Sequence, residues 1–529
     1  MMSRFTFITI WILVTTGIGS VWFYFGEPNN PVSWSTEDPD GQEESSARAL
    51  QSAPIDRLET TPPEYKATDL EILRRLSLAL TGSIPSVEWI RDFETWPQDQ
   101  KLKLALDRIL ADQRSSDYLA ERFARAFVGV ENGPFLVYRR RRMVDDLSEM
   151  IHANRPYDQI VKKLITAQGI WTSKPEVNFL TATIDPNNDN EGPDEVKLAA
   201  RVSRAFLGVR IDCVQCHDDM FGDRWKQEDF HQLASFFAGA EMSLTGLIES
   251  EKFYQVRYKR HPEAEPVPPK VPFHEALLPT EGSLRERLAT WVTHPENKPF
   301  ARALVNRVWA IMFNRPLVSP VDSIPMDSPL PKEMEYLTHE SIQSGFDLRH
   351  LIRTIAASSR FQSTSRNAGN EDVQPFPITR LRSEQVAGSI IQSASLETVD
   401  ADSHILPRIM RVMQKSEFVK RYGDAGEEEF EATGGTIPQR LTVMNGKLVH
   451  ERTEENLVMN AATRIGALAP DDSVAVEIAY LATLTRRPSK MELDHFTARL
   501  NGKKKKERAN EMQDLFWALL NSTEFAWNH

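Results

Sequence analysis

The sequence has very few cysteines and no surplus of positive charge. Only two cysteines occur among 529 residues, which excludes a scaffold held together by several disulfides. The chain has 63 Lys and Arg residues against 75 Asp and Glu residues, so its formal net charge is −12. A nucleic-acid-binding protein normally presents a basic face, and we therefore expect no nucleic-acid partner.

Familiar catalytic signatures are missing as well. The chain contains no Walker loop, no G-x-G-x-x-G, no H-E-x-x-H and no Ser-His-Asp order. The sequence alone therefore assigns no enzymatic reaction. Hydrophobic residues make up 41% of the chain and charged residues 26%, which is ordinary for globular proteins and excludes a wholly disordered chain.

The longest uncharged apolar run lies at the amino terminus. Residues Phe5 to Phe25 are 21 consecutive positions without a charge, and about 20 helical residues span the hydrocarbon core of a bilayer. Arg4 precedes the run and the next basic residue is Arg48, so the positive-inside rule places the bulk of the chain outside the cytoplasm. We predict that residues 1–26 form a single-pass transmembrane anchor in the inner (cytoplasmic) membrane. A cleaved signal peptide is the alternative, and it also exports the chain.

The remainder divides into a linker and a folded region. Residues 27–62 are rich in Pro and Ser and carry eight acidic against two basic residues, which predicts a flexible, extended linker. From Asp69 onward apolar residues recur at helical spacing and strand alternation is scarce, which predicts a mostly α fold. A Pro-rich connector at 261–273 separates two predicted helical parts, residues 63–260 and 274–529.

Two segments at opposite ends of the folded region look alike. Residues 76–81 are followed by Pro85-Ser86, and residues 480–485 are followed by Pro488-Ser489. Each pattern predicts a helix, a turn and a second helix that begins near the proline. We expect a similar helical hairpin at each position.

Both cysteines fall in one pentapeptide, Cys213-Val214-Gln215-Cys216-His217. C-x-x-C-H is the pattern of covalent haem attachment, in which two thiols three residues apart add to the vinyl groups of one porphyrin edge. His217 would then bind the iron as the proximal ligand. We predict a haem c site here, with His231 as a candidate for the opposite side of the iron.

The same residues allow other interpretations. A structural zinc site would use Cys213, Cys216 and His217 with Asp219 or His231 as the fourth ligand. A Cys213–Cys216 disulfide is compatible with an exported protein. A thioredoxin-like redox pair would need an α/β setting, whereas the preceding residues 196–207 have the pattern of an amphipathic helix.

Longer motifs carry a family resemblance. The segments Leu73–Gly82, Phe206–His217 and Trp225–Phe237 resemble the planctomycete cytochrome-c-like domain of unknown function (family 1549). Farther along, several segments resemble its usual carboxy-terminal companion domain (family 1553): Pro299–Trp309, Leu317–Asp322, Gly345–Ile352, Ile437–Asn445 and Leu515–Ser522. Together the two resemblances cover about residues 65–529.

The resemblance implies an exported, periplasmic cytochrome-like protein, and gene context in the family suggests polysaccharide breakdown or cell-surface processes. Relatives typically read Cys-His-x-His from the second cysteine onward, whereas Asp219 occupies the second histidine's place in this chain. This departure implies a lost or altered function if that histidine binds haem or metal in relatives. Four polar residues match family positions within apolar stretches: Asn306, Arg307, Gln439 and Asn445. They could line a site, and the alternative that we expect is that they cap helices or make satisfied buried hydrogen bonds.

Two functional hypotheses follow. The first is a membrane-anchored haem-c protein for electron transfer or a haem-dependent redox reaction, with an unidentified redox or cell-surface protein as partner. The second is a non-enzymatic cell-surface scaffold, with a Cys213–Cys216 disulfide or a metal clip and a role in polysaccharide processing.

Overall fold

The computed structural model describes residues 65–131, 138–185, 192–219, 224–257, 263–365, 375–399, 405–426, 430, 435–457 and 460–529. These residues belong to one compact unit that comprises residues 54–529. The predicted anchor and linker, residues 1–62, lie outside the described residues. In the described ranges, no helix is both long enough and apolar enough to cross a membrane.

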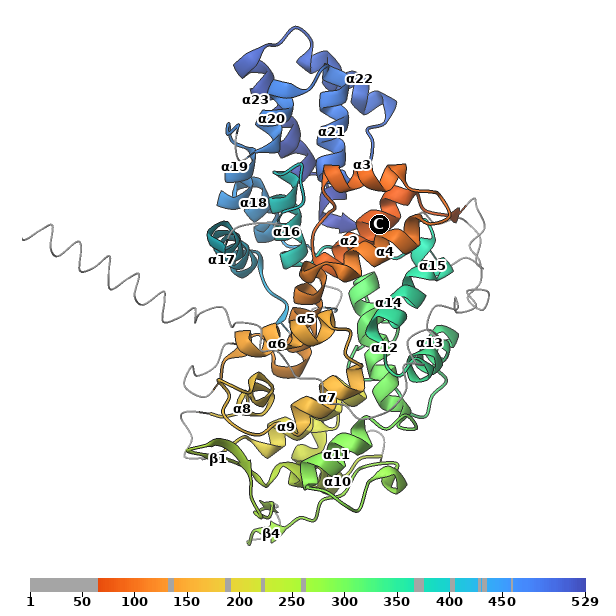
Figure 1. Cartoon of the computed structure of the whole chain (residues 1–529), viewed down its shortest axis with the longest axis vertical. Coiled ribbons are helices and arrows are strands. Elements are labelled where there is room, and N and C mark those ends of the chain that lie inside the picture. The colour runs from red at the N-terminus through yellow and green to blue at the C-terminus, as the bar shows by residue number, and fades with distance from the viewer. Residues whose placement is uncertain are drawn as a thin grey trace, which may run out of the picture. The chain divides into compact units, whose positions relative to one another are not determined.

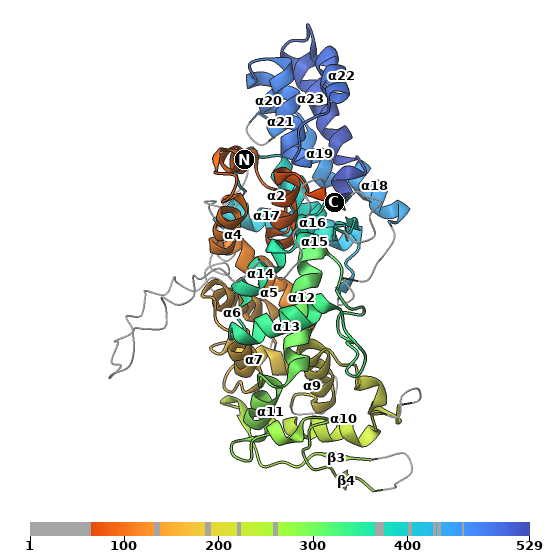
Figure 2. The same cartoon turned by 90° about the vertical axis from the view of Figure 1, so that its right-hand side faces the viewer.

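The described chain is mostly helical, as the apolar spacing predicts (Figures 1 and 2). The helices of its first part are α2 (Asp69–Thr81), α3 (Val87–Thr95), α4 (Lys101–Ala111), α5 (Gln113–Val128), α6 (Arg140–His152), α7 (Tyr157–Ile165), η3 (Pro175–Val177), α8 (Asn178–Thr181), α9 (Glu195–Arg201), η4 (Val202–Phe206), η5 (Asp212–Gln215), α10 (Gln227–Ala234) and η6 (Ser235–Phe237).

The second part continues the helical pattern. Its helices are η7 (Glu275–Leu277), α11 (Leu284–Val292), α12 (Lys298–Phe313), α13 (Lys332–Gln343), α14 (Leu348–Ala357), α15 (Ser359–Gln362), α16 (Ser383–Ser393), α17 (Ile405–Tyr422), α18 (Ile437–Asn445), α19 (Lys447–Thr453), α20 (Ala461–Leu468), α21 (Asp472–Leu484), α22 (Lys490–Leu500), α23 (Lys505–Leu520) and η9 (Glu524–Ala526).

Strands are short and form antiparallel pairs. The pairs are β1 (Ala240–Ser243) with β2 (Gly246–Glu249), β3 (Gln255–Val256) with β4 (Glu265–Pro266), and β5 (Thr379–Arg380) with β6 (Trp527–Asn528). In the first pair Ala240 lies opposite Glu249 and Ser243 lies opposite Gly246. Two-stranded ribbons of this length depend on the surrounding helices for their stability.

Helix α12 is the main link between the two predicted parts. Almost all of its side chains are buried, including the polar Asn306 and Arg307, which places this helix in the core. Helix α2 from the first part packs against α12, as do α13 and α14 from the second part (Figure 2). The two parts therefore share one core, and the predicted boundary at 261–273 stays a prediction.

Two buried arginines connect α2 to distant parts of the chain. Arg75 donates hydrogen bonds to the carbonyl oxygens of Phe361 and Ser363, both at 2.7 Å, and to that of His529 at 2.9 Å. Arg74 donates to carbonyl groups near the end of the chain as well. Hydrogen bonds from a charged donor are stronger than neutral ones, so these contacts hold α2 firmly in place.

The two predicted hairpins are confirmed. Helices α2 and α21 end at residues in the left-handed conformation, Gly82 at φ 66° and Thr485 at φ 58°. Helices α3 and α22 both begin after a serine, Ser86 or Ser489, whose hydroxyl accepts a backbone N–H of the first turn. Both sites therefore share the serine start signal, whereas the left-handed stop is taken by a glycine at one site and by a threonine at the other.

Candidate functional site

The C-x-x-C-H segment forms one exposed turn. The 3₁₀-helix η5 ends at Gln215, and Cys216 follows it directly. Side chains three positions apart in an ideal 3₁₀-helix lie one above the other, and Cys216 at the C-cap keeps right-handed helical angles, with φ −105° and ψ −21°. Both cysteines are exposed and neither forms a disulfide, whereas Val214 between them is fully buried. Buried Val214 thus anchors the turn while the two thiols point away from the core.

The imidazole of His217 is oriented by its own loop. Its Nδ1 atom lies 2.7 Å from the carbonyl oxygen of Asp218, so we assign the proton to Nδ1 and the lone pair to Nε2. The carboxylate of Asp218 accepts the backbone N–H of Gln227 at 2.8 Å, at the start of α10. A metal-binding imidazole commonly donates its other nitrogen to a carbonyl in this way.

A buried histidine holds the middle of the turn. His231, which is only 4% exposed, has Nε2 at 3.2 Å from the carbonyl oxygen of Gln215 and Nδ1 at 2.9 Å from the hydroxyl of Tyr254. The side chain of Gln227 donates to the same Gln215 oxygen at 2.9 Å. His231 would have to give up one of these bonds to bind iron, and its assignment as the second axial ligand stays a prediction.

The protonation of His231 makes this turn sensitive to pH. Burial lowers the pKa of His231 below its ordinary value of 6.5, although the bond to Gln215 partly offsets this effect. The unfolded chain therefore binds an extra proton as the pH falls below about 6.5. The contribution of the neutral His231 ring to folding stability is therefore complete above about pH 6.5 and decreases as the pH falls below that value.

We expect amide hydrogen exchange of residues 213–217 to become faster between about pH 7.5 and pH 5.5, after correction for intrinsic exchange rates. His231→Gln keeps a polar side chain but cannot titrate, so this variant should show a weaker pH response. An unchanged pH response in His231→Gln would contradict the role given to this histidine.

The candidate zinc ligands are not assembled. Within the described ranges, no three His, Cys, Asp or Glu side chains come together as a group that could hold a metal ion. Asp219 instead uses its backbone N–H to bond the carbonyl oxygen of Trp225 at 2.9 Å, which closes the loop after the motif. The zinc interpretation therefore rests on the sequence pattern.

Two of the four polar positions from the family motifs have structural roles. Asn306 is fully buried, and its Oδ1 accepts the backbone N–H groups of Leu317 and Val318 at 3.0 and 2.9 Å. Its Nδ2 donates to the carbonyl oxygens of Val318 and Val321 at 2.7 and 3.1 Å. Gln439 accepts the backbone N–H of residue 436 and so closes the capping box of α18. The expectation of caps and satisfied buried hydrogen bonds is confirmed for both.

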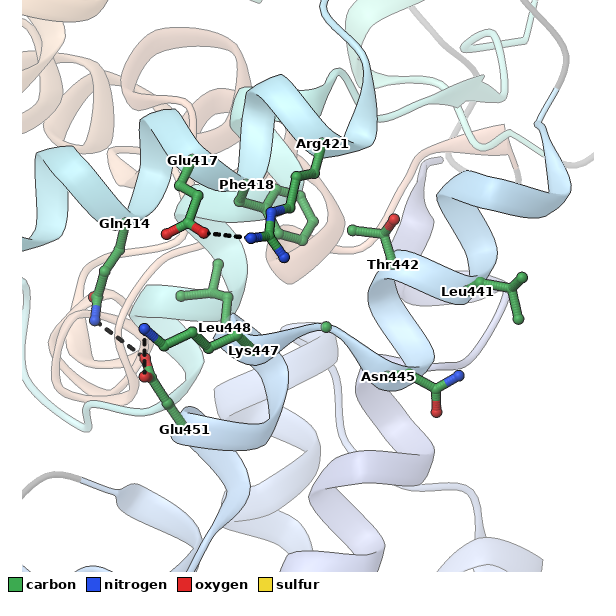
Figure 3. Close-up of a pocket in the computed structure, with 11 residues that line it drawn as sticks. Gln414, Glu417, Phe418, Arg421, Leu441, Thr442, Asn445, Lys447, Leu448 and Glu451 are labelled. Carbon is green, nitrogen blue, oxygen red and sulfur yellow. Dashed lines mark hydrogen bonds and ion pairs between the residues drawn. The ribbon is translucent and has the colours of Figure 1, made fainter.

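Asn445 lines a pocket formed by α17, α18 and α19 (Figure 3). The pocket has a volume of ≈ 290 Å³. Its charged side chains pair with one another: Glu417 with Arg421 at 2.8 Å, and Lys447 with Glu451 at 3.6 Å. Balanced charges of this kind select no particular class of ligand.

Arg307 lines a second pocket, which lies next to the C-x-x-C-H turn in the structure. Arg204 and Arg210 also line it, and both pair with Asp322. Arg204 lies 3.5 Å from Asp212 as well, the first residue of η5, and the thiol of Cys213 donates to the Arg210 carbonyl at 3.6 Å. The sequence analysis did not single out Arg204 and Arg210, although both lie in or beside a family motif.

Comparison with known families supports the resemblance seen in the sequence. The model of PSCyt2, a protein of unknown function (DUF1549), matches residues 55–242, and that of PSD1, a protein of unknown function (DUF1553), matches residues 284–500. The chain belongs to these two families. The C-x-x-C-H turn lies in the PSCyt2 segment, and the pocket beside it is lined by residues of both segments. No curated protein and no solved structure matches the sequence.

Proposed function

We propose that the PSCyt2 segment binds haem c through thioether bonds to Cys213 and Cys216, with His217 as the proximal iron ligand. The single observation that carries this proposal is that Cys213 and Cys216 are both exposed and unpaired on one short turn, at the 3₁₀-helix η5 and its C-cap. His217 follows directly, and its Nδ1 is engaged by a carbonyl so that Nε2 is the nitrogen suited to bind a metal.

The residues of the turn fit this group in other respects. Val214 fixes the turn to the core, and His231 with Gln227 holds the carbonyl of Gln215. These contacts hold the backbone between the two cysteines without using either thiol. When bound, haem would supply one-electron redox chemistry at an exposed edge of the protein. Exposure supports electron exchange with a protein partner.

Localisation and partners are part of the same proposal. The apolar run Phe5–Phe25 would anchor the chain in the inner membrane, and the acidic linker would hold the haem-bearing region outside the cytoplasm. An exported position is consistent with the use of cysteines for covalent attachment. The partner would be a redox protein or a cell-surface protein in the same compartment.

Expression of the full chain in a bacterium with haem-c maturation machinery tests the proposal. We expect the purified protein to show a Soret band, and we expect its band to stain for peroxidase activity after denaturing electrophoresis, because thioether bonds survive denaturation. Reduction should shift the absorption spectrum. A haem-free protein with a Cys213–Cys216 disulfide or with stoichiometric zinc would contradict the proposal and favour the scaffold hypothesis.

A further inference from the structure

A tyrosine from outside both family segments contacts the histidine that supports the C-x-x-C-H turn. Tyr254 lies between the PSCyt2 match, which ends at residue 242, and the PSD1 match, which begins at residue 284. Its hydroxyl lies 2.9 Å from Nδ1 of His231, and the two rings are stacked with an interplanar angle of 25°. The tyrosine therefore reaches the turn through His231.

The chemistry of the partners fixes the direction of each hydrogen bond. A carbonyl oxygen can only accept, so Nε2 of His231, which faces the Gln215 carbonyl at 3.2 Å, must carry the ring proton. A neutral imidazole has one N–H, which leaves Nδ1 as the acceptor for the O–H of Tyr254. Burial favours the neutral ring, because it lowers the pKa of His231 below its ordinary value of 6.5. The hydroxyl, the ring and the carbonyl thus form one directed chain of hydrogen bonds.

This chain ends at a peptide group between the two cysteines. Gln215 directly precedes Cys216, and its carbonyl oxygen also accepts a hydrogen bond from Nε2 of Gln227 at 2.9 Å. The two donors together use both lone pairs of this oxygen. The peptide group that joins Gln215 to Cys216 is therefore held from the protein side, while Cys213 and Cys216 stay exposed.

Tyr254 is itself held by the short ribbon that follows it. Its carbonyl oxygen accepts the backbone N–H of Val267 at 3.0 Å, and the next two residues form β3, which pairs with β4. The backbone N–H of Lys270 donates to the carbonyl oxygen of Gln232 in α10 at 3.4 Å, and the ribbon lies beside this helix (Figure 2). Part of the Pro-rich segment 261–273 therefore fixes the position of Tyr254.

We infer that Tyr254 is a positioning residue for the C-x-x-C-H turn and that it acts through the ring of His231. Its hydroxyl keeps the Nε2–H of that ring directed at the Gln215 carbonyl, and so holds the backbone from which Cys216 and His217 extend. Outer partners of this kind orient the residues that bind a metal. The relevance of Tyr254 to haem rests on the haem-c proposal, whereas its support of the turn can be measured on the haem-free chain.

Hydrogen exchange of residues 213–217 in the haem-free full chain tests this role at about pH 7.5, where the His231 ring is neutral. We expect exchange in Tyr254→Phe to be about tenfold faster than in the wild type, because a buried acceptor loses its donor. His231→Leu should also exchange faster. Adding Tyr254→Phe to His231→Leu should change the rate no further, because the two residues act in one chain.

Tyr422→Phe is the matched control for Tyr254→Phe. It removes a hydroxyl that accepts a hydrogen bond from Arg380 at 2.8 Å, in α17 of the PSD1 segment. Exchange of residues 213–217 in this variant should equal that in the wild type. Circular dichroism checks that every variant is folded.

Nitrogen NMR of the full chain with isotopically labelled histidine separates this role from a general loss of stability. The signals of His231 are identified by their absence in His231→Leu. Tyr254→Phe should move the Nδ1 signal of His231 downfield, because a ring nitrogen that accepts a hydrogen bond resonates upfield of one that does not. Tyr422→Phe should leave this signal in place.

The outcomes distinguish this inference from the haem proposal. Unchanged exchange in Tyr254→Phe, an unmoved Nδ1 signal, or a further acceleration when Tyr254→Phe is added to His231→Leu would each overturn the inference. Unchanged exchange together with covalent haem in the matured wild type would contradict the inference alone. Faster exchange in Tyr254→Phe without covalent haem in the matured wild type would support the positioning role and contradict the haem proposal alone.

Discussion

Replacement of Glu384 by glutamine is expected to lower the free energy of unfolding by about 3–5 kcal/mol, the usual cost of breaking a buried ion pair from one side. Glu384 lies in the first turn of α16. Its Oε1 atom is 3.0 Å from Nη1 of Arg122 and 2.8 Å from Nε of Arg382. The hydroxyl of Tyr118 donates to the same oxygen at 3.1 Å. The two arginine side chains are only 2% and 6% exposed. Glutamine would keep the shape but remove the negative charge that these groups share.

The same cluster makes stability depend on pH. Burial alone raises the pKa of Glu384, but the charges of Arg122 and Arg382 outweigh burial and hold the pKa well below its usual value of 4.5. The contribution of Glu384 is therefore complete above about pH 4.5 and decreases as the pH falls toward the folded-state pKa. Denaturant unfolding between pH 7 and pH 3 measures this effect. The free energy of unfolding should decrease less with falling pH in Glu384→Gln than in the wild type.

Glu417→Gln is the matched control for this experiment. Its carboxylate pairs with Arg421 at the surface, where both side chains are more than half exposed. Exposed ion pairs contribute about 0–1 kcal/mol, so this variant should unfold almost as the wild type does. The buried cluster joins α5 of the PSCyt2 segment to α16 of the PSD1 segment. If Glu384→Gln lowers the free energy of unfolding no more than Glu417→Gln does, this structural role is contradicted.

Replacement of both Cys213 and Cys216 by serine is expected to remove all covalently bound haem. The two cysteines are the only thiols in the chain, so no other residue can form a thioether. Both side chains are exposed, and exposed substitutions usually change stability by no more than about 0.5 kcal/mol. The apoprotein should therefore fold, which circular dichroism would check, while the peroxidase stain and the Soret band disappear.

His217→Ala separates iron ligation from attachment. This variant keeps both thiols, so haem should remain attached while the absorption spectrum changes because the proximal ligand is lost. His339→Ala, on the exposed face of α13, replaces another exposed histidine and should leave the spectrum unchanged. A spectrum that is identical in His217→Ala and the wild type would contradict the assignment of His217 as the ligand.

The features that sequence analysis predicts well are local in the chain. The helices follow from apolar spacing, and the two hairpins follow from Gly82, Ser86 and their counterparts, because caps and turns depend on a few adjacent residues. The C-x-x-C-H motif is local for the same reason. Only two residues separate Cys213 from Cys216, so the sequence already places both on one turn.

Features built from distant residues could not be predicted in the same way. Glu384 and Arg122 are ordinary charged residues in sequence, and only the fold, which brings their side chains within 3.0 Å, makes them a buried pair. The bond of His231 to the Gln215 carbonyl likewise depends on where α10 packs. A signal for the pocket that Arg307 lines did exist: Arg210, Arg307 and Asp322 come from three different family motifs, and all three line it.

Mass spectrometry of the protease-derived peptide that contains residues 213–217 tests the central claim most directly. The full chain would be matured in a bacterium that attaches haem c, purified and digested under denaturing conditions that release non-covalent ligands. The haem-c proposal predicts one peptide whose mass is increased by one haem, with both sulfur atoms protected from thiol alkylation. A peptide of unmodified mass with two alkylated cysteines, or one with Cys213 and Cys216 joined as a disulfide, would contradict it.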